Sequence, residues 1–216
     1  MALVAISTLA VVLCGGSSAR IDSGRKMNER IRTIGVQFSL DEFSNDPDGA
    51  IHRQRSRILM DIEAAGAAVI EFAAAQIDEN GRLISWSRWR AGQQQMLRWD
   101  ASSRRINRLP LPASPNVTAV LADAFGPTGD PVEHGYRKVD DHSYEIEEGL
   151  GVFRLSFPDD LDRRTFEAVD PVDGQVKSRI GAIRLGDGPV ITPEVLEMMA
   201  AVPTDARTKF LRPGGG

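Results

Sequence analysis

Residues 2–19 (ALVAISTLAVVLCGGSSA) constrain the fold of this chain most, because they contain no charged side chain. A helix of about 17 to 25 mainly apolar residues crosses the hydrocarbon core of a membrane. Two alternatives use the same stretch: a signal peptide cleaved after Ala19, and a lipoprotein signal acylated at Cys14. The first lacks a basic start, and the second has Leu13 where a small residue should precede the cysteine. We therefore expect residues 1–19 to span a membrane.

A polar stretch with a regular apolar stripe follows this run. Met27, Ile31, Ile34 and Phe38 are separated by four, three and four residues, so they share one face of a helix. Four apolar side chains on one exposed face are unfavourable in water. We therefore predict an amphipathic helix over residues 20–46, whose stripe contacts the rest of the chain, a neighbouring subunit, or both.

The remaining composition is that of one folded domain. Hydrophobic residues make up 42% and charged residues 26% of the 216 residues, and the part after the helix is long enough to bury a core. The net charge of −4 is opposite to the basic surface of a nucleic-acid-binding domain, so we expect no nucleic-acid partner. Cys14 is the only cysteine and the three histidines are scattered, so we expect neither a metal site nor a cofactor.

The chain from residue 69 onward has the pattern of β-structure. Runs rich in β-branched and aromatic residues alternate with turn sequences such as Glu79-Asn80-Gly81 and Arg90-Ala91-Gly92, which predicts an antiparallel meander. The expected strands are 69–78, 81–89, 94–100, 105–110, 142–148, 151–160 and 178–186. Residues 50–68 are interpreted as a second short helix or an irregular segment, residues 117–125 as a short helix or strand, and residues 193–203 as a helix that starts at Pro193.

These elements predict an α+β fold: one long N-terminal helix, first membrane-spanning and then amphipathic, followed by a β-rich antiparallel head. The expected division of the chain is a membrane-spanning segment over 1–19, an amphipathic continuation over 20–46, a globular head over 47–212 and a disordered tail over 213–216.

Few residues form a pattern with catalytic or metal-binding chemistry. No G-x-S-x-G sequence, phosphate-binding glycine loop or H-E-x-x-H sequence is present. The two candidate clusters are a histidine-acid group (Glu133, His134, Asp140, Asp141 and His142) and an aspartate group (Asp159, Asp160 and Asp162). We interpret both as exposed loop residues, because the second lacks the twelve-residue spacing and the glycine of a calcium loop. We therefore expect no enzymatic activity.

Three tryptophans, Trp86, Trp89 and Trp99, lie on neighbouring expected strands. Aromatic residues at such positions fill a protein core more often than they form a platform for a ligand. We therefore predict that the three side chains pack in the core, and that Trp89 breaks the register of its strand at a bulge or at a strand end.

The sequence MALVAISTLAVVL resembles the membrane helix of type IV pilin-like proteins. In that family the helix follows a basic leader, a cleavage-site glycine, a phenylalanine and a glutamate, and all four are absent from this sequence. The amphipathic end FSLDEFSNDP and the runs GRLISWSRW, QQMLRWD and GVFRLSFPDD are similar in length and order to the minor pseudopilins of type II secretion systems, the J-type subunit above all.

The resemblance implies a structural subunit of a pseudopilus that takes part in protein secretion. Its partners would be other pseudopilin subunits and inner-membrane lipid, and it would be a single-pass protein of a bacterial inner membrane with its head in the periplasm. The resemblance assigns membrane and filament packing to Leu3, Val4, Ile6, Leu9, Val12 and Leu13. It assigns a subunit-contact stripe to Met27, Ile31, Ile34 and Phe38.

Two other interpretations of the sequence remain open. The first is an exported soluble or lipid-tethered periplasmic binding protein, or a hydrolase without a recognised motif, whose N-terminus is removed. The second is an anchored domain that faces the cytoplasm, because five basic residues follow the apolar run and none precedes it. The intact mass of the mature protein would separate the first interpretation from a membrane-retained subunit.

Overall fold

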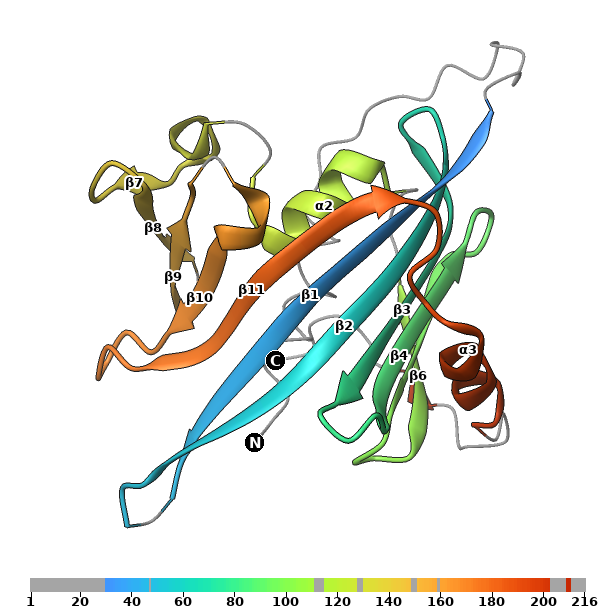
Figure 1. Ribbon diagram of the computed structural model, residues 1–216, viewed down its shortest axis with the longest axis horizontal. Helices are drawn as coiled ribbons and strands as arrows, with labels where there is room; N and C mark the ends of the chain where they lie inside the picture. Colours follow the sequence, from blue (N-terminus) through green and yellow to red (C-terminus); the bar gives the residue numbers. More distant parts are fainter. Residues whose placement is uncertain are drawn as a thin grey trace.

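The computed structural model describes residues 30–46, 48–110, 115–127, 130–148, 151–158, 160–202 and 209–210. In these residues the chain forms one twelve-stranded sheet and two α-helices (Figure 1). The strands follow the order β12-β6-β5-β4-β3-β2-β1-β11-β10-β9-β8-β7. Every neighbouring pair is antiparallel except β12, which runs parallel to β6.

The strands are β1 (Ile31–Asn45), β2 (Ile51–Ala65), β3 (Ala68–Asp78), β4 (Leu83–Arg90), β5 (Gln95–Asp100), β6 (Arg105–Pro110), β7 (Arg137–Lys138), β8 (Ser143–Glu148), β9 (Gly151–Ser156), β10 (Thr165–Val169), β11 (Val176–Asp187) and β12 (Lys209–Phe210). The helices are α2 (Val117–Phe125) and α3 (Pro193–Ala200), with two short 3-10 helices, η1 (Pro131–His134) and η2 (Leu161–Arg163).

The predicted amphipathic helix over 20–46 is wrong, because its second half is strand β1. Ile34, Val36, Phe38 and Leu40 alternate with small or polar residues and are all buried. Alternate side chains of a strand point to opposite faces of the sheet, so this period of two buries one whole face. The burial of this whole face favours a strand over the helix that the four-three-four spacing of Met27, Ile31, Ile34 and Phe38 indicates.

Residues 50–68, interpreted as a short helix or an irregular segment, form strand β2 instead. Ile58, Met60, Ile62 and Ala64 are buried at every second position. In the turn between β1 and β2, Gly49 adopts a positive φ of 84° and its N–H donates to the carbonyl of Asp46 (2.9 Å). The long N-terminal arm is therefore a β-hairpin, and the α+β prediction with a long first helix is wrong.

The antiparallel meander predicted over residues 69–110 is confirmed by strands β3 to β6. The later expected strands correspond to β8, β9 and β11, and the helix predicted from Pro193 is α3. In the meander, apolar residues at every second position and turn residues between the runs are enough to predict the strands. This works because each strand pairs with the next one in sequence.

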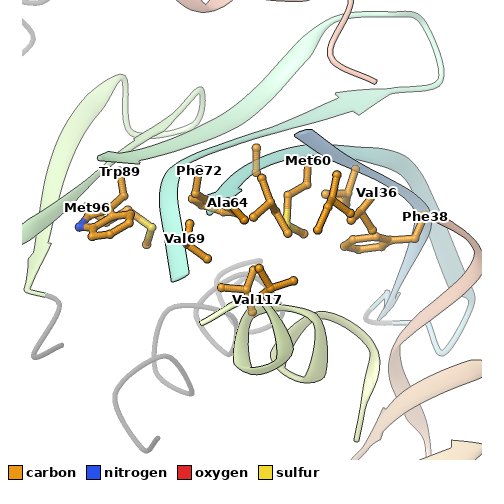
Figure 2. Close-up of a cluster of buried hydrophobic side chains, with 14 of the residues drawn as sticks. Val36, Phe38, Met60, Ala64, Val69, Phe72, Trp89, Met96 and Val117 are labelled. Carbon is orange, nitrogen blue, oxygen red and sulfur yellow. The ribbon is translucent and has the colours of Figure 1, made fainter. Parts of the chain in front are cut away.

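The side of the sheet that we call the inner face bears Val36, Phe38 and Met60 and packs against α2. Val117 and Val120 of α2 are buried in the same cluster. Figure 2 shows these side chains pointing from the curved strands toward α2. The hydrophobic core of the protein therefore lies between the inner face and this short helix.

The opposite side, the outer face, is covered only in part. Leu59 and Ala75 point to this side and form a second cluster with Val195 and Met199 of α3. In Figure 1, α3 lies beside the wing formed by β4 and β6. The rest of the outer face, over β2, β1 and β11 to β7, carries mostly polar and charged residues.

This architecture contradicts the resemblance to type IV pilin-like proteins and pseudopilins, because residues 31–45, where the second half of the long pilin helix is expected, form strand β1 of a large antiparallel sheet. No helix in the described part of the chain has the length and apolar character needed to cross a membrane. The expected single-pass placement in an inner membrane is therefore corrected. Residues 1–19, where that prediction put the span, lie outside the described residues.

Candidate functional site

A small apolar hollow lies on the inner face. Phe38, Leu40, Ile58, Ala74 and Ile180 line it, together with polar side chains at one end. Its volume is about 40 Å³, which is enough for a water-sized group. The hollow is therefore a preformed apolar contact surface but not a complete ligand cavity.

The polar end of the apolar hollow is a hydrogen-bonded chain across four strands. Ser85 Oγ donates to Gln76 Oε1 (3.1 Å), Gln76 Nε2 donates to Ser56 Oγ (2.9 Å), and Ser56 Oγ donates to the carbonyl of Leu40 (3.4 Å). All three polar side chains are buried. Because each polar group has a partner, the chain can remain buried without a large desolvation penalty.

The inner face continues beyond α2 onto the wing formed by β8, β9 and β10. Phe153 and Phe166 stack there with ring centroids 5.6 Å apart. These two rings, and the neighbouring Tyr144 and Ile146, are only half-buried. This wing therefore offers aromatic and aliphatic surface that the described residues cover incompletely.

Helix α2 crosses the inner face from one wing toward the other. At its start, Val117 N–H donates to the carbonyl of Ala67 in the β2–β3 turn (2.9 Å), and Asn116 Oδ1 accepts from the N–H of Ala119 (2.6 Å). Just past its end, Gly126 packs so closely that a Cβ there would lie 3.2 Å from Leu155 Cδ1 on β9. The helix is thus fixed at both ends and covers the middle of the face.

Arg98 on β5 is a buried cation on the inner face. It is 9% exposed, and in register it faces Ser87, which lines the apolar hollow. Among the described residues, no carboxylate lies within ion-pair distance of its guanidinium. Burial lowers the pKa of Arg98, and the charge of Asp100 opposes this effect. A buried guanidinium without a direct counter-ion is unfavourable.

The nearest acid on the same strand is already engaged elsewhere. Asp100 Oδ1 accepts from the backbone N–H of Ser102 (2.9 Å) and from the hydroxyl of the same residue, and so holds the turn after β5. The negative charge of Asp100 contributes to the raised pKa of Glu42 on β1, although three strands separate β1 from β5. The sheet therefore curls enough to bring charges from distant strands together on its inner face.

Replacement of Glu42 with glutamine should stabilise the protein at neutral pH. Burial, and secondarily the charge of Asp100, raises the pKa of Glu42 above its ordinary value of 4.5. A carboxyl whose pKa is raised by folding contributes stability below that ordinary value and loses it as pH rises through the folded-state pKa. The glutamine side chain cannot ionise, so we expect Glu42→Gln to raise Tm at pH 7 by about 2 °C.

Thermal unfolding of both proteins at acid and neutral pH measures this effect. The gain should disappear at a pH below the ordinary value of 4.5, where the native glutamate is protonated in both states. The exposed residue Glu147 of β8 provides a charge-matched control, Glu147→Gln. An equal gain in the control, or a gain that is the same at both pH values, would contradict burial of the Glu42 carboxylate.

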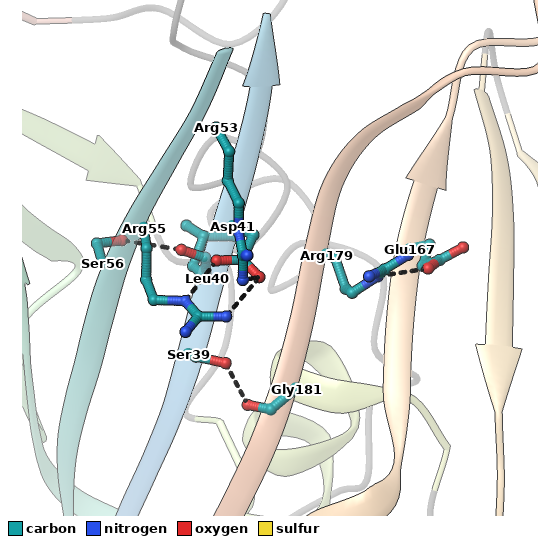
Figure 3. A network of polar contacts seen from close by, with 9 residues as sticks. All are labelled: Ser39, Leu40, Asp41, Arg53, Arg55, Ser56, Glu167, Arg179 and Gly181. Carbon is teal, nitrogen blue, oxygen red and sulfur yellow. Dashed lines mark hydrogen bonds and ion pairs between the residues drawn. The ribbon is translucent and has the colours of Figure 1, made fainter. Parts of the chain in front are cut away.

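A row of alternating charges crosses the outer face from β2 to β7. Its members are in register with one another, strand after strand: Arg55, Asp41, Arg179, Glu167, Arg154, Glu145 and Arg137. Ion pairs join Arg55 to Asp41 (2.8 Å), Arg179 to Glu167 (2.6 Å), and both Arg154 and Arg137 to Glu145 (2.8 Å each). Figure 3 shows the part of the row on β2, β1, β11 and β10.

The acids of this row lie beneath the arginines. The side chains of Asp41, Glu167 and Glu145 are 6%, 17% and 21% exposed, whereas their arginine partners are at least 45% exposed. Opposite charges at paired positions favour one register over its neighbours. The outer face therefore presents guanidinium groups to solvent, although the whole chain carries a net charge of −4.

The residues predicted from the sequence to form contact surfaces do not lie together in the structure. Of the expected stripe, Ile34 and Phe38 are buried in the core of the chain itself, Ile31 is 60% exposed, and Met27 lies outside the described residues. The expected packing residues Leu3, Val4, Ile6, Leu9, Val12 and Leu13 also lie outside them. The stripe is therefore split between the core and the start of β1.

The two titratable clusters stay at the surface. His134 and His142 are exposed, and Asp140 Oδ1 accepts from the backbone N–H of His142 (3.0 Å) in a turn. Asp160 and Asp162 are exposed as well, and Asp159 is outside the described residues. Within the described ranges, no group of three or more histidine, cysteine, aspartate or glutamate side chains is placed to hold a metal ion.

The prediction that the tryptophans pack in the core is confirmed. Trp89 is buried in the inner cluster, while Trp86 is buried in the outer cluster with Trp99 beside it. Residues three apart on a strand point to opposite faces, so Trp89 lies opposite Trp86 through the regular alternation of β4, one residue before the strand ends at Arg90, and not through a bulge. The residues that sequence reasoning missed are the arginines Arg55, Arg57, Arg98 and Arg184, which carry no local motif.

Comparison with known proteins adds little to this description. No family model matches the chain, and no curated protein matches it either. One similar solved structure is the crystal structure of an uncharacterized conserved protein from Thermus thermophilus. It has a TM-score of 0.39 and 9% sequence identity, over 82% of this chain and 90% of that chain.

Proposed function

We propose that this chain is a binding protein, without catalytic chemistry of its own, that holds an amphiphile with an acyl chain and an acidic head group on the inner face of its sheet. The single observation that carries the proposal is the buried Arg98, whose guanidinium lacks an ion-pair partner among the described residues and whose register partner Ser87 lines the apolar hollow. A bound carboxylate or phosphate would give Arg98 that counter-ion.

The apolar part of such a ligand has a suitable surface beside Arg98. The hollow is lined by Phe38, Leu40 and Ile180, and the half-buried rings of Phe153 and Phe166 extend the same face. Ligand sites are typically lined by apolar side chains with a few placed polar groups. Arg98 is the polar group that would fix the orientation of the ligand.

The volume of the hollow indicates how an acyl chain would enter. About 40 Å³ is far below the 300 to 1,000 Å³, roughly, of a drug-sized ligand pocket. The ligand must therefore displace α2 from the middle of the face, or extend along the wing of β8 to β10 that α2 leaves half-covered. Either route exchanges protein contacts for ligand contacts on the same apolar surface.

A fluorescent sixteen-carbon carboxylic acid and its uncharged methyl ester together test this function. We expect the native chain to bind both probes saturably and the acid more tightly. Arg98→Met keeps the length and apolar packing of the side chain but removes its charge. It should weaken binding of the acid by about tenfold, the equivalent of one charge-assisted contact, and leave binding of the ester unchanged.

Arg105→Met is the matched control, because Arg105 is an exposed arginine on the neighbouring strand β6. It should not change binding of either probe. Competition by unlabelled dodecanoate separates site binding from adsorption of the probe. Absence of saturable binding, or equal binding of the acid by the native chain and by Arg98→Met, would refute the proposed function.

A further inference from the structure

A second hollow lies on the outer face, on the side of the sheet opposite α2. Strands β1, β2 and β11 form its floor, the β3–β4 turn forms its rim, and its volume is about 540 Å³. We call it the arginine hollow and define it by Gln37, Ser39, Arg55, Arg57, Glu79 and Arg184. Its volume lies in the range of about 300 to 1,000 Å³ that is typical of small-molecule sites.

A β-bulge lies in the floor of the arginine hollow. Gln37 pairs with Arg184, but Ser39 pairs with Gly181, so β11 has one residue more than β1 at this point. Ala182, the residue at the bulge, has a φ of 51°, which is uncommon for a residue with a side chain. Ser39 Oγ donates to the carbonyl of Gly181 across the bulge (3.0 Å; Figure 3). Bulges and strained residues of this kind redirect side chains at functional sites.

Two of the three arginines that line the arginine hollow make no ion pair with an acid of the described residues. Arg55 is paired with Asp41, through Nε to Oδ1 at 2.8 Å. Arg57 and Arg184 line the same hollow, and neither has an acidic partner within ion-pair distance among the described residues. Two guanidinium groups therefore face one concave space without a direct counter-ion from the described part of the chain.

The two acids that line the arginine hollow, Asp78 and Glu79, form no ion pair with Arg57 or Arg184. Asp78 Oδ1 accepts from the backbone N–H groups of Asn80 (2.9 Å) and Arg82 (2.7 Å), so its carboxylate holds the turn. Glu79 on the rim acts on Arg55 through its charge. The Gln37 side chain also lines the hollow, and its amide N–H₂ group supplies a further donor.

We propose that the arginine hollow binds a small organic anion through a phosphate or carboxylate group held between Arg57 and Arg184. The planar guanidinium fork binds both kinds of group through two parallel hydrogen bonds. The hollow is larger than one phosphate ion, so the ligand class is a phosphorylated or polycarboxylated molecule. The site lies on the other face from Arg98 and is independent of the proposed acyl site.

Titration of the full chain with pyrophosphate at low ionic strength tests the proposal by calorimetry. We expect saturable binding with one ligand per chain. The double substitution Arg57→Ala and Arg184→Ala should weaken binding at least about tenfold, because it removes both charge-assisted contacts. The control, Arg105→Ala with Arg163→Ala, removes the same charge from two exposed arginines elsewhere, and should change affinity less than about threefold.

A second titration distinguishes a soluble anion from a lipid head group. Phosphatidylcholine vesicles with and without phosphatidic acid present the same phosphate chemistry at a surface. Loss of vesicle binding in the Arg57/Arg184 variant, without pyrophosphate binding by the native chain, assigns the site to a lipid phosphate. Loss of pyrophosphate binding in that variant assigns it to a soluble ligand.

Two outcomes would overturn the proposal. One is no binding of either probe by the native chain, and the other is an equal loss of binding in the control variant. Both variants must keep the native thermal transition, which shows that they remain folded. Because pyrophosphate and vesicle binding are measured without the acyl probe, failure of the acyl site leaves the result at the arginine hollow unaffected.

Discussion

Replacing Gly35 with valine should destabilise the protein by about 3 kcal/mol or more, because no side chain fits at this position of β1. A Cβ on Gly35 would lie 2.4 Å from the carbonyl oxygen of Gly188 and 2.6 Å from Val190 Cγ1. The segment cannot simply withdraw, since the N–H of Gly188 donates to the carbonyl of Thr33 (2.9 Å). The clash therefore forces either β1 or the connection to α3 out of place.

Urea denaturation of the two glycine variants measures the effect against a close control. Gly186 is the register partner of Gly35 on β11, and a Cβ there would meet no atom within 4 Å. Gly186→Val should therefore change the free energy of unfolding by less than about 1 kcal/mol, since it adds only strand propensity. If Gly35→Val and Gly186→Val lower the free energy of unfolding equally, the close packing of Gly188 and Val190 against Gly35 is contradicted.

The strands of the β3–β6 meander could be predicted from sequence because their signals are local. Trp86 and Trp99, for example, lie on runs bounded by turn residues, and they pair directly across β4 and β5. The β1–β2 hairpin could not be placed in the same way. Its apolar residues Ile31, Ile34 and Phe38 satisfy a helical spacing, while Ile34, Val36 and Phe38 satisfy a strand spacing. Only pairing with β2 and β11 decides between the two periods.

The candidate sites depend on contacts between residues that lie far apart in the chain. Arg57 and Arg184 come from β2 and β11 and share a hollow only because β1 lies between those strands. In the sequence they are two of many arginines interspersed with acids. Cross-strand register, which no local pattern specifies, is the missing information.

The burial of Arg98 on the inner face could not be predicted from the sequence either. Its position in the run QMLRWD alternates with apolar residues, which marks it as the polar side of a half-buried strand. In the structure both faces of β5 are covered, and Met96 and Arg98 share the inner one. Because β5 is covered on both faces, Arg98 is buried at a position where the sequence pattern predicts a solvent-exposed side chain. This is the kind of local inconsistency that marks functional sites.

Replacing Asp61 with alanine should cost about 2 kcal/mol of stability and loosen the connection between β11 and α3. Asp61 is the register partner of Gly35 on β2, and its carboxylate accepts from the N–H of Val190 (2.7 Å) and of Ile191 (3.3 Å). Alanine leaves these donors without an acceptor, which costs roughly 1 to 3 kcal/mol. Gly35 and Asp61 therefore act together on residues 188–191. The missing side chain of Gly35 leaves room for this segment, and the Asp61 carboxylate binds its backbone N–H groups.

Asparagine at the same position should retain most of the stability, and the remaining deficit should depend on pH. Burial raises the pKa of Asp61 above its ordinary value of 3.8, although the hydrogen bonds from Val190 and Ile191 oppose this shift. The native protein therefore loses stability from this group as pH rises through the folded-state pKa, whereas Asp61→Asn does not. The stability difference between the native protein and Asp61→Asn should narrow from acid to neutral pH.

Urea denaturation and amide hydrogen exchange together measure these effects. Exchange at Val190 and Ile191 should accelerate in Asp61→Ala more than in Asp61→Asn, because only alanine removes the acceptor. Glu63→Ala is the control, since Glu63 lies two residues further along β2 on the same face and is exposed. Equal stability and equal exchange in Asp61→Ala and the control would mean that the carboxylate does not hold this segment. In that case α3 would be attached to the outer face by its apolar contacts alone.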